Sequence, residues 1–166
     1  MMEKIKADIE IKSAYDALDA IRSLFDEYAA SLGIDLSFQN YKRELDELPG
    51  KYAPPLGRLY LARVDGVAAG CVALRPFGDD ARADRPSEMK RLYVRPEFRG
   101  LKLGRALIEK IIADARVMNY SHILLDTLDR LEVSLALYKK MGFYEIAPYY
   151  HNPYQGAIYL RFDIKL

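Results

Sequence analysis

The spacing of apolar positions changes several times along the chain, and each change marks an expected element. Residues 7–12 alternate apolar and polar side chains, which is typical of a strand with one buried face. Over 15–31 the apolar residues recur every three or four positions, which predicts an amphipathic helix that Ser13 caps and Gly33 ends. A second, shorter helix is expected over 37–48.

The rest of the chain combines strand-like and helix-like patterns. Residues 58–77 form two β-rich runs around an Asp-Gly pair, which is typical of a tight hairpin. A helical pattern over 104–118 lies between strand-like runs at 87–94 and 123–127, so these two strands should be parallel, with a right-handed crossover. A helix over 131–141 and strands over 143–147 and 157–164 complete the pattern. The predicted fold class is α/β, with a mixed, mostly antiparallel sheet flanked by helices.

Length and composition limit the class of protein. The chain has 166 residues, of which 51% are apolar and 30% charged, and this suits one domain over 1–166 with its own core. Its 25 basic and 24 acidic side chains exclude bulk electrostatic attraction to nucleic acid or to a membrane. The longest nearly apolar run, 67–74, is too short to cross a bilayer, and no signal peptide is evident. One cysteine excludes a cysteine-based zinc site and fits a cytoplasmic protein, and we expect no metal.

A local basic segment interrupts this neutral balance. Residues 87–118 carry eight Lys or Arg against four Asp or Glu, which suggests a small anionic ligand, although ordinary scatter of surface charge accounts for it equally well. Within the segment, Gly100 and Gly104 adjoin the start of the predicted helix, where unpaired N–H groups and the helix dipole favour a phosphate. Arg99, Lys102 and Arg105 add cations. The alternative is a tight strand-to-helix turn whose basic side chains are solvated.

Two motifs resemble those of the GNAT superfamily of acetyl-CoA-dependent N-acetyltransferases. Residues 99–107, RGLKLGRAL, are similar to its pyrophosphate loop, written [QR]-x-x-G-x-[GA], with Arg99 and Gly104 in the first and last positions. Lys102 stands where the pattern has its middle glycine. Residues 136–143, ALYKKMGF, resemble the second signature, A-x-x-L-Y-x-x-x-G-F. The resemblance implies an acyl-CoA N-acyltransferase fold with acetyl-CoA as cosubstrate, and it leaves a homodimer open.

The resemblance also implies where acetyl-CoA would bind. In the family, the strands that correspond to 88–94 and 123–127 splay apart at their carboxyl ends, and the pantetheine arm fills the gap like an extra strand. Backbone contacts to this arm would come from Leu92, Tyr93 and Val94. The pyrophosphate would be held by Arg99, Gly100, Leu101, Lys102, Leu103 and Gly104.

Glu88 is a candidate base, because an ammonium group must lose a proton before it attacks a thioester. Strand alternation places Glu88 on the same face as Lys90, Leu92 and Val94. It lies six residues before Val94, and some family members carry a base glutamate at the corresponding distance. A structural role, in which Glu88 pairs with Lys90 or an arginine, is weighed equally.

Tyr138 is the candidate proton donor to the departing thiolate, because it aligns with the tyrosine that usually has this role in the family. The alternative is a core tyrosine, since Leu131, Leu135 and Tyr138 recur at helical spacing. His151, in an aromatic-rich loop, could line an acceptor pocket or lie on the surface. Cys71, within a buried-strand run, is expected in the core.

The expected activity is transfer of an acetyl group from acetyl-CoA to a primary amine of a small molecule or an amino acid. Transfer should be direct, within a ternary complex, because no plausible nucleophile suggests an acyl-enzyme. A protein or peptide amine is the alternative acceptor. A module that binds acyl-CoA without turnover, acting as a sensor, is the alternative outside the enzyme class.

Overall fold

The computed structural model describes residues 5–78 and 85–165, and these contain one mixed seven-stranded sheet. Its strand order is β1-β2-β3-β4-β5-β7-β6, and among the described strands only β4 and β5 pair in parallel. The predicted α/β class and the parallel pair on either side of the crossover helix are thereby confirmed. The strands are β1 (Ile9–Ser13), β2 (Arg58–Val64), β3 (Val67–Pro76), β4 (Pro86–Val94), β5 (His122–Leu128), β6 (Tyr144–Ile146) and β7 (Ala157–Asp163).

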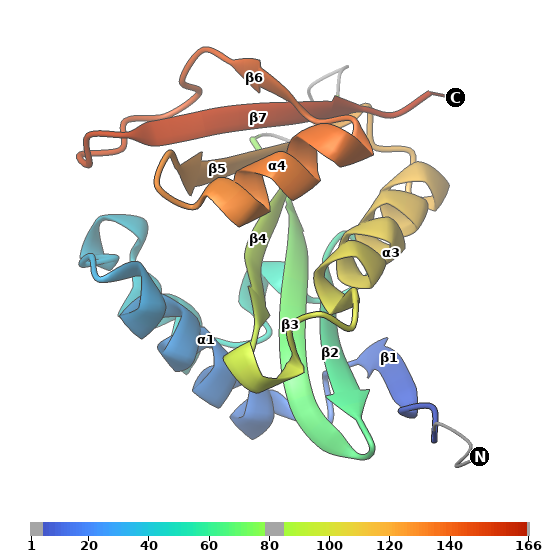
Figure 1. Cartoon of the computed structure of the whole chain (residues 1–166). Helices are drawn as coiled ribbons and strands as arrows, with labels where there is room; N and C mark the ends of the chain where they lie inside the picture. The colour runs from blue at the N-terminus through green and yellow to red at the C-terminus, as the bar shows by residue number, and fades with distance from the viewer. Residues whose placement is uncertain (1–4, 79–84, 166) are drawn as a thin grey trace.

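Helices cover both faces of the sheet (Figure 1). The α-helices are α1 (Leu18–Leu32), α2 (Tyr41–Asp46), α3 (Leu103–Val117) and α4 (Glu132–Met141), and the 3-10 turns are η1 (Ser37–Gln39), η2 (Gly50–Tyr52) and η3 (Pro96–Phe98). Along β3, Val72 packs with α3 and α4, whereas Cys71 packs with α1. Each fully buried aliphatic side chain in these two cores contributes roughly 1.5–3 kcal/mol.

The gap between β4 and β5 is the feature that positions the site. The two strands pair only at their first residues, and the last paired residues are Glu88 and Leu124. Beyond this point β4 stays with β3 as far as Val94, while β5 stays with β7 as far as Leu128. The strands therefore splay at their carboxyl ends, as predicted.

A β-bulge in β4 changes which side chains share a face. Arg91 has φ +60°, and one more residue of β4 than of β3 lies between the pairs Cys71–Tyr93 and Ala73–Lys90. The extra residue shifts the alternation, so Leu92 packs in the same core as Met89, on the side of α3. The prediction that Glu88 shares a face with Leu92 and Val94 is therefore wrong, because strict alternation does not survive the bulge.

Two smaller expectations also differ from the structure. Ser13 does not cap the first helix: it pairs with Tyr60 at the end of β1, and α1 begins at Leu18 without a side-chain cap. The helix predicted over 37–48 is interrupted at Asn40, whose left-handed backbone (φ +54°) separates η1 from α2. Both differences arise where a strand pairing or a turn outweighs helical spacing.

Candidate active site

A cavity lies in the gap between β4 and β5. Both strands contribute to its wall, as do the end of α1, the segment 34–39, α4 and the connection between β6 and β7. Its polar lining residues are Tyr28, Gln39, Lys90, Arg91, Asp126, Thr127, Tyr138 and Asn152. The cavity therefore has polar groups from strands that no longer pair with each other, together with an apolar wall that includes Leu36 and Leu128.

The predicted phosphate loop connects β4 to α3. Arg99 turns back and donates a hydrogen bond from Nε to the Val94 carbonyl oxygen at 3.3 Å. Helix α3 begins at Leu103 without a side-chain cap, so the N–H groups of its first turn are available to an anion. Figure 1 shows α3 beginning just after the carboxyl end of β4, to which η3 connects it. The arrangement suits a phosphate group. Residues 99–104 do not line the cavity, whose last wall residue on β4 is Leu92.

The backbone conformation at one position of the loop, and the space around another, explain which residues the motif has there. Lys102, which replaces the middle glycine, has φ +60°, a left-handed conformation that glycine adopts without steric cost. A Cβ atom on Gly104 would lie 3.5 Å from Leu137 Cδ2, which is ordinary van der Waals contact. The last motif position therefore has room for alanine, whereas a longer side chain would press on α4 or on the bound anion.

Tyr138 lies on α4 and lines the cavity. Its ring packs against Phe143 with centroids 5.9 Å apart, so the core role considered for this residue is realised. Its hydroxyl makes no hydrogen bond within residues 5–78 and 85–165. Burial raises the pKa of Tyr138, which keeps the hydroxyl protonated at neutral pH. A packed ring and an unpaired, protonated hydroxyl fit a proton donor, and this role stays a prediction.

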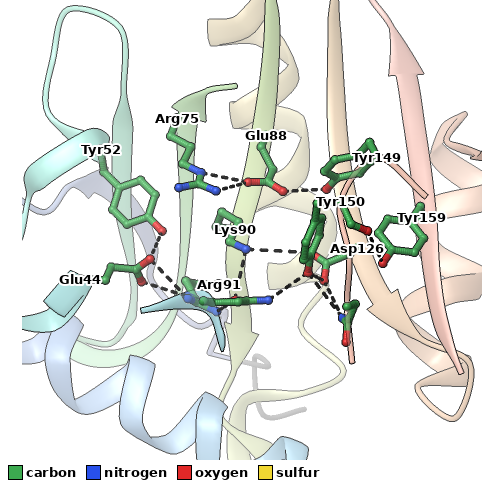
Figure 2. A network of polar contacts seen from close by, with 12 residues as sticks. Glu44, Tyr52, Arg75, Glu88, Lys90, Arg91, Asp126, Tyr149, Tyr150 and Tyr159 are labelled. Carbon is green, nitrogen blue, oxygen red and sulfur yellow. Dashed lines mark hydrogen bonds and ion pairs between the residues drawn. The ribbon is translucent and has the colours of Figure 1, made fainter. Parts of the chain in front are cut away.

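Glu88 is held in a buried ion pair. Arg75 approaches Oε1 to 2.7 Å, and the Tyr149 hydroxyl donates to Oε2 at 2.6 Å (Figure 2). Burial alone would raise the pKa of Glu88, but the charges of Lys90 and Arg75 and two hydrogen bonds outweigh it and lower the pKa. The side chain is 1% exposed and is absent from the cavity wall. The pairing with an arginine is thus present, and catalysis by Glu88 stays a prediction.

Next to Glu88 lies a polar network that the sequence analysis did not include. Arg91 donates to Glu44 at 2.9 Å and to Gln39 at 2.9 Å, while Lys90 donates to Gln39 at 3.3 Å. Figure 2 shows Glu44, Arg91 and Lys90 toward the β4 side of the strand gap and Asp126 toward the β5 side. Burial lowers the pKa of Lys90, despite the neighbouring carboxylates of Glu88 and Asp126. The sequence signal that could have revealed this network is the presence of charged residues within the apolar runs around 90 and 126.

Two further candidates fall outside the site. Cys71 is fully buried, its thiol faces the Arg91 carbonyl oxygen at 3.3 Å, and burial raises its pKa, so it is a core residue. His151 is exposed, and Asn152 is the residue of that loop on the cavity wall. The described residues hold no cluster of three or more His, Cys, Asp or Glu suited to a metal ion. None of the helices over 5–78 and 85–165 has the length and apolarity that spanning a bilayer requires.

A mixed sheet opened between two parallel strands, with an uncapped helix start after the first of them, is the arrangement expected for the class of acyl-CoA-dependent N-acyltransferases. The profile of the acetyltransferase (GNAT) family matches residues 18–143. The chain is 44% identical over 166 residues to an uncharacterized N-acetyltransferase of Schizosaccharomyces pombe, covering 99% of each. It is 33% identical over 214 residues to an uncharacterized N-acetyltransferase of Dictyostelium discoideum, covering 95% of this chain and 99% of the relative.

Solved structures agree with this assignment at the level of the fold. An acetyltransferase from Streptococcus agalactiae superposes with a TM-score of 0.74 at 22% identity, covering 92% of this chain and 96% of that one. The chain therefore belongs to the GNAT family and is an acetyl-CoA-dependent N-acetyltransferase.

Proposed function

We propose that the protein transfers the acetyl group of acetyl-CoA directly to a primary amine of a small molecule or an amino acid. The observation that supports this most is the cavity in the strand gap, which runs from the vicinity of Leu92 to the polar groups around Asp126. The pantetheine arm would bond the backbone of Leu92, Tyr93 and Val94, which β5 leaves unpaired. The pyrophosphate would bind the loop from Arg99 to Gly104.

In the proposed reaction, the amine nitrogen bonds to the acetyl carbonyl carbon and the carbon–sulfur bond breaks. The amine gives up a proton, for which Glu88 is the acceptor predicted from the sequence. Tyr138 donates its hydroxyl proton to the departing sulfur. The proton is present at neutral pH because burial raises the pKa of Tyr138. No covalent acyl-enzyme is needed, because both substrates meet in one cavity.

The cover over the cavity supports a small acceptor rather than a polypeptide. Gln39 donates to the Tyr150 hydroxyl at 3.1 Å, and the Tyr154 hydroxyl bonds both backbone groups of Asp35, at 2.8 and 2.9 Å. The rings of Phe38 and Tyr154 add a contact, with centroids 5.6 Å apart. The segment 34–39 and the β6–β7 connection thus hold each other over the acceptor side, where an extended peptide would need an open groove.

The test is release of free thiol from acetyl-CoA with a panel of amines. We expect turnover with one class of small amines or amino acids, and slower turnover with peptides that carry a free amino terminus or a lysine. Preference for the peptides would favour the alternative acceptor. Acetyl-CoA binding without turnover of any amine would favour a sensor module, and absence of binding would refute the proposal altogether.

A further inference from the structure

Two charged side chains mark the point where β4 and β5 separate. The last paired residues are Glu88 and Leu124, and two residues further along each strand stand Lys90 and Asp126. Lys90 Nζ and Asp126 Oδ1 face each other across the opening at 3.9 Å (Figure 2). An arm that enters from the open end of the gap has its reactive end near this vertex, so the transferred group and the amine should meet there.

Asp126 is the one carboxylate among the described residues of the cavity wall. Its side chain is 12% exposed, against 1% for Glu88. Oδ2 accepts hydrogen bonds from the Tyr150 hydroxyl and, at 3.4 Å, from Asn152. Oδ1 accepts none within residues 5–78 and 85–165, and Lys90 at 3.9 Å is too distant to use its lone pairs. Oδ2 is therefore held in place by hydrogen bonds, whereas Oδ1 is available to accept a hydrogen bond from a substrate.

We propose that Asp126 is the catalytic residue that accepts the proton of the acceptor amine. The protonated amine donates an N–H hydrogen bond to Oδ1 and transfers this proton to Oδ1, and its neutral nitrogen then attacks the acetyl carbonyl carbon. The carbon–sulfur bond breaks, the sulfur takes the Tyr138 proton, and the second proton that the nitrogen loses replaces it on Tyr138. Lys90 stabilises the carboxylate charge before the reaction, and the Tyr150 hydroxyl holds its orientation. The inference rests on the proposed function and specifies which residue of the same site accepts the proton.

Glu88 is less suited to this step. Its Oε1 is engaged by Arg75 and its Oε2 accepts from Tyr149, so a proton on Glu88 would neutralise a buried ion pair, and the side chain does not line the cavity. The groups whose charges interact with Asp126 come from five parts of the chain. They are Tyr28 of α1, Lys90 of β4, Tyr138 of α4, Tyr159 of β7, and Tyr149 and Tyr150 of the β6–β7 connection.

The experiment compares Asp126→Asn with Asp114→Asn. Asp114, on α3, is a matched control: it also accepts a tyrosine hydroxyl, that of Tyr60, is 18% exposed, and lies outside the cavity wall. Thiol release is followed from pH 6 to above the pKa of the amine, and acetyl-CoA affinity is measured by calorimetry. Slow hydrolysis of acetyl-CoA without amine is a second assay, because attack by water also releases a proton.

We expect Asp126→Asn to lower kcat about 10²- to 10⁴-fold at neutral pH, with a smaller loss where the amine is already deprotonated. Acetyl-CoA affinity should stay within about twofold, and Asp114→Asn should keep the wild-type rates. Equal rates of wild type and Asp126→Asn in both assays would overturn the inference. A raised KM for the amine with unchanged kcat would also overturn it, since Asp126 would then only dock the amine. Failure of the wild type to bind acetyl-CoA would instead refute the proposed function.

Discussion

At the scale of single residues, Tyr138 has two candidate roles that one substitution can separate. Its ring packs in the core, and its hydroxyl is proposed to donate a proton. Tyr138→Phe removes the hydroxyl and keeps the contact with Phe143, so folding should be unaffected. If the hydroxyl protonates the leaving sulfur, turnover should fall by about 10² to 10⁴. The loss should not be larger, because a thiolate is already a fair leaving group without a proton. Steady-state kinetics would show the loss, and calorimetry with acetyl-CoA and a melting curve serve as controls. Wild-type turnover, measured where chemistry limits the rate, would leave Tyr138 as a core residue.

Lys102 allows a test of backbone strain in the phosphate loop. An L-residue in the left-handed conformation is strained by roughly 1–2 kcal/mol, while glycine adds about 0.4–1 kcal/mol of freedom to the unfolded chain. Lys102→Gly should therefore raise the free energy of unfolding by about 1 kcal/mol or less.

The control for this change is Lys102→Ala, which keeps the strain and removes the same charge. Urea unfolding of the three proteins measures the difference, and both variants should bind acetyl-CoA modestly more weakly because a cation is lost. A glycine variant no more stable than the alanine variant would argue against strain at this position.

At the scale of elements, the start of α3 can be tested through Gly104. Gly104→Asp places a carboxylate where a phosphate would bind, and its side chain is longer than the space before Leu137 admits. Acetyl-CoA affinity should fall at least about tenfold, which is about 1.4 kcal/mol. Gly104→Ala is the matched control and should keep most of the affinity, since a Cβ atom fits there. Unchanged calorimetric affinity in Gly104→Asp would remove the loop from the site.

The order and the type of the main elements could be predicted from the sequence, because each depends on a local pattern. The Asp-Gly hairpin, the α3 helix and the strand gap all follow from spacing or from the resemblance. The bulge at Arg91 could not be predicted, since nothing in the residue type signals a positive φ. It moved Leu92 to the other face and so changed the expected surroundings of Glu88.

The candidate site was predictable only in part, for a related reason. The loop from Arg99 to Gly104 is continuous in sequence, so a motif can describe it. The bond between Gln39 and Tyr150 joins residues 111 positions apart, and no local pattern relates them. Asp126 has a weak signal, a charge within an apolar strand, and its place at the vertex depends on where pairing with β4 stops.

At the scale of the whole molecule, the buried pair of Glu88 and Arg75 should affect acid stability. The folded-state pKa of Glu88 lies below its ordinary value of 4.5, so the pair stabilises the fold above about pH 4.5. This contribution is lost as the pH falls through the folded-state pKa. Glu88→Gln leaves Arg75 without its charge partner and should cost about 3 kcal/mol at pH 7.

Urea unfolding at several pH values between 7 and 3 measures this effect. The difference in unfolding free energy between wild type and Glu88→Gln should shrink as the pH falls, because protonated Glu88 resembles glutamine in charge. A difference that stays constant over the whole range would show that the ion pair does not couple folding to pH.

The separation of β4 from β5 gives the protein a sheet edge in its interior rather than at its rim. Sheet edges ordinarily attract any extended chain, and proteins protect them with charges or short strands. Here the edge lies beside the cavity, so a pantetheine arm that hydrogen-bonds to the backbone of Leu92–Val94 would act as an additional strand. Ligand occupancy should then be visible as slower amide exchange along β4 and as a melting temperature that climbs with acetyl-CoA concentration. Binding and completion of the sheet would be one event.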